Sequence, residues 1–321
     1  HLDSAWLWRE NDTRVKKIQQ TFSKAAIYLN QFHNFTFTAN ATVHYQWVLE
    51  DNPGLFMRIK ELVNQGKWEF VGGDYVEMDC NLPCGESLIR QRLIGQRFYL
   101  KNFGRISDIA WYDDVFGWPN TLPQILAKTG AKYMYTNKFC YSNESIAVVG
   151  EHFPFLHFLW QAPDKKSGII VTWSQHKNNF NKQLKQFSQH SVQVKQTQNE
   201  QNVFDYRESW EQMKQRLNLD RNEIIPYLMN AYGIGDGGLG PRIGEILEQI
   251  NWEWLNFVKN GTAKDMFELL EPYRKTLPVW RDELYLETHQ GTLTSVGMIK
   301  ENNATFETLM NITESLCVFE S

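Results

Sequence analysis

The sequence predicts an α/β fold with a mostly parallel sheet and surrounding helices. Short apolar stretches that read as buried strands alternate with longer stretches in which apolar residues recur every three to four positions. Of the 321 residues, 42% are hydrophobic, which is enough for a sizeable core. Alternation of strand and helix is typical of a parallel or mostly parallel sheet. The length suits one large domain or one and a fraction.

The first predicted element is an amphipathic helix, because five apolar side chains share one face. They are Val15, Ile18, Phe22, Ala26 and Leu29. Residues 35–39 follow as a strand with alternating aromatic side chains. Residues 53–64 predict a helix with proline in its first turn. Residues 67–71 predict a strand that two glycines close.

Residues 85–102 predict a long helix that ends at Gly104, since glycine is common just past a helix C-terminus. Residues 178–202 are rich in Asn and Gln with Lys between them, and they predict a mobile surface insertion. Further strands are expected at residues 106–112, 132–136, 169–173 and 223–231.

A His-x-Asp pair opens the chain. On an extended segment His1 and Asp3 point to the same face, so a ring nitrogen and a carboxylate oxygen can converge on one cation. Trp6 and Trp8 follow and would suit a wall for a flat, partly apolar ligand. A pair of this kind is also common in ordinary loops. It therefore indicates a metal site only together with further ligands downstream.

Three further polar residues stand where such ligands are expected. Asp114 follows the strand at 106–112, and the end of a strand is where α/β folds place their chemistry. Asp236 lies in a glycine-rich loop whose backbone can approach a ligand closely. His289 lies in a polar loop near the end of the chain. Together with His1 and Asp3, these residues predict a metal-dependent site.

Five sequence blocks in a fixed order resemble glycoside hydrolase family 38 α-mannosidases, of the branch that includes cytosolic and vacuolar enzymes. The resemblance extends over almost the whole chain. The blocks are HLDSAWLW (1–8), VGGDYVEMDCNLPCGESLIRQRLIGQRFYLKNFG (71–104), WYDDVFGWPNTLPQIL (111–126), GDGGLGP (235–241) and ETHQGTLTS (287–295).

The resemblance implies a role for each candidate residue. His1, Asp3, Asp114 and His289 match the metal ligands of the family, and the implied cofactor is one divalent ion, zinc or alternatively cobalt. Asp114 also matches the nucleophile, and Asp236 lies in the region of the acid/base. The implied reaction is retaining hydrolysis of terminal α-linked mannose in oligosaccharides through a covalent mannosyl-Asp114 intermediate.

The resemblance also implies the architecture. Residues 1–284 would form an irregular seven-stranded α/β barrel that lacks its first strand. Residues 285–321 would begin a three-helix bundle, with its first helix at residues 301–317, and carry the last metal ligand, His289. Since no methionine or apolar strand precedes His1, we expect the chain to be a fragment of a longer protein.

Six residues are candidates for substrate binding. The alternative for the tryptophans is ordinary core packing, and Glu77 and Asp79 would alternatively cap their loop. His176 follows the strand at 169–173 and could face the pocket. The candidates are Trp6, Trp8, Glu77, Asp79, Trp118 and His176.

Composition narrows the partners. The net charge of −4 gives no indication of nucleic-acid binding, and no apolar stretch approaches the roughly 18 residues that span a bilayer. The resemblance implies that the partner is an α-mannoside oligosaccharide. A homo-oligomer would form through domains outside this chain.

Cysteines and sequons leave the compartment open between a lysosomal or vacuolar and a cytoplasmic location. Cys80 and Cys84 would form a bridge, a zinc pair or two free thiols. Seven Asn-x-Ser/Thr sequons favour the secretory route if they carry glycans. They begin at Asn11, Asn34, Asn40, Asn143, Asn260, Asn303 and Asn311.

Two other function classes fit the same residues. A metal-dependent carbohydrate deacetylase also uses a His/Asp-bound cation in an α/β barrel, but there the metal activates water and no covalent sugar forms. A catalytically inactive sugar-binding protein would keep the metal and lack the acid/base. A covalent adduct on Asp114 separates the first alternative from a mannosidase, and the effect of Asp236→Asn on turnover separates the second.

Overall fold

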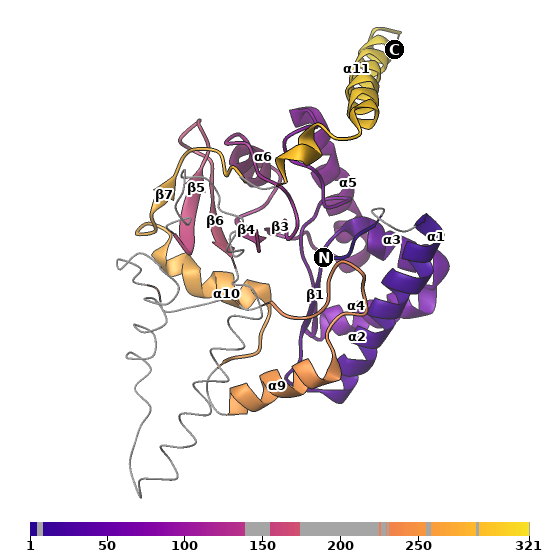
Figure 1. Ribbon diagram of the computed structural model, residues 1–321, viewed down its shortest axis with the longest axis vertical. Helices are drawn as coiled ribbons and strands as arrows, with labels where there is room; N and C mark the ends of the chain where they lie inside the picture. The colour runs from indigo at the N-terminus through magenta and orange to yellow at the C-terminus, as the bar shows by residue number, and fades with distance from the viewer. Residues whose placement is uncertain are drawn as a thin grey trace, which may run out of the picture.

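The computed structural model shows an α/β fold in which helices surround a mixed sheet (Figure 1). It describes residues 1–4, 9–138, 155–173, 225, 229, 231–254, 258–286 and 289–320. The predicted insertion at 178–202 and most of the predicted strand at 223–231 lie outside these residues.

The described strands form two sheets. β1 (Phe37–Ala39) pairs in parallel with β2 (Trp68–Phe70). The second sheet has the order β3-β4-β6-β5-β7, and all its pairs are parallel except β5 with β6. Its strands are β3 (Ile109–Trp111), β4 (Tyr133–Thr136), β5 (His157–Gln161), β6 (Gly168–Trp173) and β7 (Val279–Trp280). The mostly parallel sheet was predicted, and the antiparallel β5 was not.

One backbone hydrogen bond joins the two sheets. The Gly72 N–H, just past β2, donates to the Ile109 carbonyl of β3 at 2.8 Å. The Val71 N–H donates to the Ala39 carbonyl at 3.1 Å, which extends the β1–β2 pairing to the same point. The carboxyl ends of these strands therefore meet at one edge of the fold.

The helices account for most of the remaining described residues. An N-terminal run of α1 (Glu10–Asp12), the π-helix η1 (Thr13–Gln19) and α2 (Gln20–Gln31) is continuous. The others are α3 (Thr42–Asp51), α4 (Pro53–Asn64), α5 (Gly85–Phe103), α6 (Leu122–Lys128), α9 (Ile243–Trp254), α10 (Ala263–Leu270), η2 (Glu271–Tyr273), η3 (Gln290–Leu293) and α11 (Gly297–Glu320).

The five-stranded sheet is covered on both faces, and its side chains alternate accordingly. Ile109, Tyr133 and Ile170 pack in the core cluster that contains the apolar face of α10. Ala110 and Met134 pack in the opposite cluster, with α6 and the start of α5. Burial on both faces explains why these strands read as continuous apolar runs in the sequence.

A third core cluster surrounds β1 and β2. It combines side chains of α2, α3, α4 and α9 with an aromatic group in which Phe22, Tyr45 and Trp68 meet edge to face or tilted. α4 begins as its sequence predicts, because Asn52 accepts a hydrogen bond from the Leu55 N–H and Pro53 occupies the first turn.

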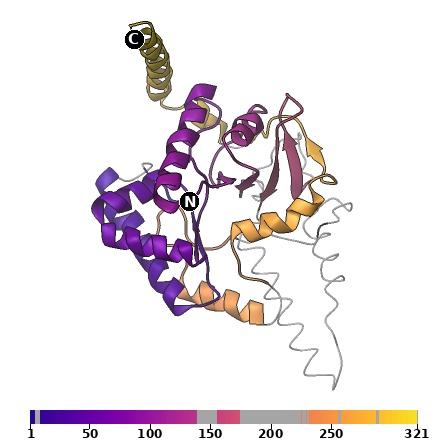
Figure 2. The ribbon, with the colours of Figure 1, turned by 180° about the vertical axis from the view of Figure 1, so that it is seen from behind.

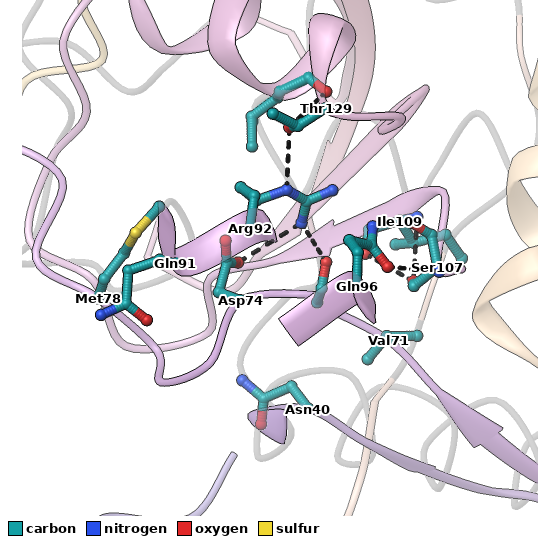
Figure 3. A network of polar contacts seen from close by, with 12 residues as sticks. Asn40, Val71, Asp74, Met78, Gln91, Arg92, Gln96, Ser107, Ile109 and Thr129 are labelled. Atoms are coloured by element: carbon teal, nitrogen blue, oxygen red, sulfur yellow. Dashed lines mark hydrogen bonds and ion pairs between the residues drawn. The ribbon is translucent and has the colours of Figure 1, made fainter. Parts of the chain in front are cut away.

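α5 lies close against the segment that follows β2. Arg92 of α5 is fully buried, and its guanidinium donates to the Gly72 carbonyl and to Thr129, with Asp74 3.6 Å away (Figure 3). The side chain of Gln96, also in α5, accepts a hydrogen bond from the Ser107 N–H at 2.9 Å. These contacts fix the turn after β2, from which the chain enters the candidate site.

α11 projects away from the rest of the fold in both views (Figures 1 and 2). Arg90 of α5 forms an ion pair with Glu314, and the Cys84 N–H donates to Glu307 at 3.0 Å. The predicted helix at 301–317 is thus present. Its membership of a three-helix bundle stays a prediction.

Two expectations about the chain as a whole can be compared with the described residues. Cys80, Cys84 and Cys317 are not in disulfide bonds, so the Cys80–Cys84 bridge is not formed, and the zinc pair stays a prediction. No helix in the described ranges combines the length and the apolar character needed to cross a bilayer.

Candidate active site

Four predicted residues converge at the carboxyl edge of the parallel strands. The Nε2 atom of His1 lies 3.2 Å from an oxygen of Asp3, 3.4 Å from one of Asp236 and 3.8 Å from one of Asp114. One donor atom from each of these residues lies within 4.8 Å of all the others. The N-terminus itself is central in the fold, beside the end of β1 (Figure 1).

Asp114 owes its position to the end of β3. The Tyr112 N–H still donates to the Tyr135 carbonyl at 3.0 Å, and the chain then leaves the sheet. Gly117 turns it with a φ of +95°, a conformation that favours glycine. The Asp114 side chain is 37% exposed, so its carboxylate is accessible from solvent.

Lys138 lies beside Asp114 and was not singled out in the sequence. It follows β4, the strand next to β3, so the two residues share the carboxyl edge of the sheet. The Lys138 ammonium pairs with the Asp114 carboxylate and lies 4.9 Å from the centre of the Phe116 ring. The sequence marks Lys138 only by its place just after a predicted strand, which does not distinguish it from other lysines.

Asp236 is held by a loop that docks on the N-terminal segment. The Asp3 N–H donates to the Asp236 carbonyl at 3.1 Å. The Leu239 N–H donates to Thr21 of α2 at 2.7 Å. A Cβ on Gly238 would lie 2.6 Å from Cγ of Lys17, so this close approach requires glycine.

Lys17 secures the same region from η1. Its side chain is buried, and its ammonium donates to the Asp3 carbonyl at 2.8 Å. Burial lowers the pKa of Lys17, while the charges of Asp3 and Asp236 oppose that shift. π-helical turns are rare and frequently occur at functional sites, and this one places a buried cation behind the candidate site.

Glu77 lies behind His1 and Asp114. One of its oxygens accepts hydrogen bonds from Nδ1 of His1 and from the Asn40 amide, and the other accepts from the Asp114 N–H at 2.8 Å. Asn40 begins a sequon but is 3% exposed, so in this fold it is not accessible to a glycan.

The charges of the site compensate one another around a single imidazole. Burial opposes protonation of His1, but Glu77 and the hydrogen bonds to Asp236 and Asp3 raise its pKa well above the usual range. The hydrogen bond from His1 lowers the pKa of Asp236. Burial raises the pKa of Asp113 to about 7. The carboxylate oxygens around His1 favour a proton on its imidazole ring. They would also favour a metal cation in the place of that proton.

His289, the fourth predicted ligand, is not in this group of four. Its ring is exposed and stacks on Phe116 with centroids 4.7 Å apart. Asp236, which the resemblance implies as the acid/base, completes the group instead. The structure therefore brings together three of the four predicted metal ligands and adds Asp236.

Two of the substrate-binding candidates match the structural alternatives left open for them. Trp118 is 1% exposed and exchanges backbone hydrogen bonds with Leu284, which is the core-packing alternative. Asp79 accepts from the N–H groups of Asn81 and Leu82, which is the loop-capping alternative. Trp6, Trp8 and His176 lie outside the described residues.

Comparison with known proteins agrees with the geometry. The model for the glycosyl hydrolases family 38 N-terminal domain matches residues 1–283. The chain is 33% identical to alpha-mannosidase G of Dictyostelium discoideum over 321 residues, and 30% identical to an alpha-mannosidase of Saccharomyces cerevisiae over 315 residues. These matches cover 98% and 94% of the chain and 26% of each relative.

Among solved structures, an alpha-mannosidase from Enterococcus faecalis shares the fold. The TM-score is 0.59 with 16% identity, over 88% of this chain and 30% of that one. The chain spans about a quarter of the length of the curated relatives. The match to the family model over most of the chain nevertheless shows that this chain belongs to glycosyl hydrolase family 38.

Proposed function

We propose that the protein is a metal-dependent, retaining α-mannosidase that hydrolyses terminal α-linked mannose from oligosaccharides. The observation that carries the proposal is the convergence of His1, Asp3, Asp114 and Asp236 at the carboxyl edge of the parallel strands. Family membership supports the reaction class, since the relatives are named alpha-mannosidases.

The donor set fits a divalent cation. An imidazole nitrogen and three carboxylate oxygens within 4.8 Å of one another match the N and O ligands that zinc prefers, with cobalt as the alternative. His1, Asp3 and Asp114 would hold the ion, with His289 as the fourth ligand that the family implies and Asp236 beside them as the acid/base. When bound, the ion would orient the sugar through its 2- and 3-hydroxyls.

Asp114 would act as the nucleophile. Its exposed carboxylate attacks the anomeric carbon as the bond to the leaving oxygen breaks, and that oxygen takes a proton from the acid/base residue. Water then attacks the same carbon and gives up a proton to the acid/base residue, and Asp114 is released. The ammonium of Lys138 forms an ion pair with the Asp114 carboxylate.

Asp236 is the proposed acid/base. Retaining enzymes separate their two carboxyl groups by roughly 5–5.5 Å, and here one oxygen of Asp114 lies within 4.8 Å of one of Asp236. The pKa of Asp236 is lowered beside His1, whereas a general acid needs a raised pKa. Asp236→Asn therefore tests this assignment directly.

The proposal includes the architecture of the family. Residues 1–284 would form a seven-stranded α/β barrel and residues 285–321 the start of a three-helix bundle. The hydrogen bond from Gly72 to Ile109 supports this arrangement, because it links the end of β2 to β3 of the other sheet.

The test is hydrolysis of an aryl α-mannoside by the intact protein, before and after chelation, with Asp114→Asn alongside. We expect turnover to be lost in both cases, and to return with zinc or cobalt only in the wild type. Mass spectrometry with a slow fluorinated mannoside should find the adduct on Asp114. Absence of turnover with every metal would reject the proposal in favour of a sugar-binding protein or a deacetylase.

A further inference from the structure

We propose that Glu77 is a positioning residue that sets the ring nitrogen of His1 and the backbone of Asp114 with a single carboxylate. The inference rests on the proposed metal-dependent function and goes beyond it. Glu77 would orient two of the proposed metal ligands, His1 and Asp114, without itself contacting metal or sugar.

The contacts of Glu77 use both of its oxygens. Oε2 accepts from Nδ1 of His1 and from Nδ2 of Asn40, the latter at 2.9 Å, and Oε1 accepts from the Asp114 N–H at 2.8 Å. The side chain is 11% exposed. A carboxylate so occupied has little capacity left for a sugar hydroxyl, so the sugar contact expected from the sequence gives way to a supporting role.

The bond to His1 determines which ring nitrogen faces the other ligands. A carboxylate only accepts hydrogen bonds, so Nδ1 must carry a hydrogen. The lone pair of a neutral His1 is then on Nε2, the atom 3.2 Å from Asp3 and 3.4 Å from Asp236. Metal-bound histidines commonly donate their other N–H to a carboxylate, which fixes the tautomer and the ring.

The second oxygen links this choice to the proposed nucleophile. His1 and Asp114 come from distant parts of the chain, and Glu77 is hydrogen-bonded to both. Movement of its carboxylate would therefore displace the imidazole and the Asp114 backbone together. A shift of about 1 Å in a catalytic group can cost roughly 100-fold in rate.

Glu77 itself has a rigid support. The Tyr75 N–H donates to the Gln91 carbonyl at 3.1 Å, and the Val76 N–H donates to the Gln91 side chain at 3.1 Å. The buried contacts of Arg92 with Asp74 and the Gly72 carbonyl hold the preceding turn (Figure 3). α5 thus anchors the segment that presents Glu77.

Glutamine cannot replace Glu77 in this arrangement. If its amide oxygen faces His1 and Asn40, its NH₂ group faces the Asp114 N–H, and two donors meet. If the amide is reversed, its NH₂ group faces the Nδ1 hydrogen, and the ring would have to move its hydrogen to Nε2. Either orientation disturbs one of the two ligands.

Glu69 offers a matched control. It is 6% exposed, and its carboxylate likewise accepts from backbone N–H groups, those of Ala263 and Lys264 at 2.8 and 2.9 Å. Glu69→Gln removes the same charge from a buried, hydrogen-bonded position that has no contact with His1 or Asp114 among its hydrogen bonds. A general effect of losing a buried carboxylate would therefore appear in both variants.

The experiment measures zinc and cobalt affinity of the intact protein by competition with a chromophoric chelator. We expect Glu77→Gln to bind roughly 10- to 100-fold more weakly than wild type, and Glu69→Gln to bind like wild type. The absorption bands of bound cobalt should shift in Glu77→Gln alone. At saturating zinc, kcat for an aryl α-mannoside should stay reduced while KM changes less.

If Glu77→Gln does not fold, Glu77→Asp provides the same readout, because it keeps the charge but is one methylene too short to reach both partners. Wild-type affinity and an unchanged cobalt spectrum in the folded Glu77 variant would overturn the inference and leave the proposed function intact. A wild-type protein that binds neither ion would reject the metal-dependent function, and the inference with it.

Discussion

At the residue scale, the site depends on charges that no single motif contains. Asp114 could be identified from the sequence because it follows an apolar strand. Lys138 is equally close to the chemistry, but a lysine after a strand has no distinguishing pattern. Its relevance comes only from the pairing of β3 with β4, which brings the two strand ends together.

Substitution of Lys138 should impair catalysis. Lys138→Met removes the cation paired with Asp114, and a hydrogen bond to a charged group is worth about 1.5–3 kcal/mol. We expect kcat/KM for an aryl α-mannoside to fall roughly 10- to 100-fold. Lys138→Arg should recover part of the loss, and Lys128→Met, at the exposed end of α6, should have no effect. Equal activity of the Met and Arg variants would contradict the role of the charge.

His44 should make stability depend on pH. It is 1% exposed, bonded to Ser4 at 2.8 Å, and burial next to His1 lowers its pKa to about 3. The unfolded chain takes up this proton near pH 6.5 and the folded chain does not, so stability is lost as pH falls from about 6.5 toward 3.

The contribution of His44 is measurable as a difference. Between pH 6 and pH 4 it should remove about 1.4 kcal/mol of unfolding free energy per pH unit. Urea unfolding of wild type and His44→Gln at several pH values gives the comparison, and the slope should be smaller in the variant. Parallel pH profiles would show that His44 takes up its proton in the folded state as readily as in the unfolded one.

At the element scale, helices with clear start and stop signals in the sequence were predictable. The predicted helix at 53–64 has the bounds of α4, and the predicted end of α5 at Gly104 is confirmed by its left-handed C-cap. β5 was missed because it is short, apolar and without clear alternation, so periodicity alone does not identify it. The capping box of Thr262 and Asp265 marks the start of α10 in the sequence.

Gly95 shows how closely α5 approaches the turn after β2. A Cβ at this position would lie 2.8 Å from the Asp74 carbonyl carbon and closer still to the Gly73 carbonyl oxygen. Both obstacles are backbone, so Gly95→Ala should force the helix outward and cost roughly 1–3 kcal/mol. Chemical denaturation should also show the matched control Gly244→Ala, in α9 with no neighbour within 4 Å, to be neutral or slightly stabilising. Equal stability of the two variants would mean that the contact is easily relieved.

At the scale of the whole molecule, the candidate site is assembled from segments that lie far apart in the sequence. His1, Asp3 and Asp114 were predicted together because their blocks match the family in order. Asp236 was predicted beside them as the acid/base, and its exact place among them depends on how the glycine loop docks on η1 and α2. Trp118 is a core residue for a tertiary reason as well, because the sheet and the Leu284 segment cover it.

A site built from distant segments should couple metal binding to the stability of the whole fold. An ion that binds only the folded chain stabilises it by RT ln(1 + [L]/Kd), which is about 2.7 kcal/mol at a concentration 100 times Kd. Zinc should therefore raise the Tm of the intact wild-type protein, and Asp3→Asn should lose most of that rise while keeping its metal-free Tm within a few degrees.

Asp236→Asn and His289→Ala, measured in the same way, test which of the two residues is the fourth metal ligand. The variant that lowers the zinc-dependent rise in Tm marks the ligand, because a residue that serves only in catalysis leaves the linkage to folding unchanged. A Tm of wild type that zinc and cobalt leave unmoved would exclude a metal site at these residues.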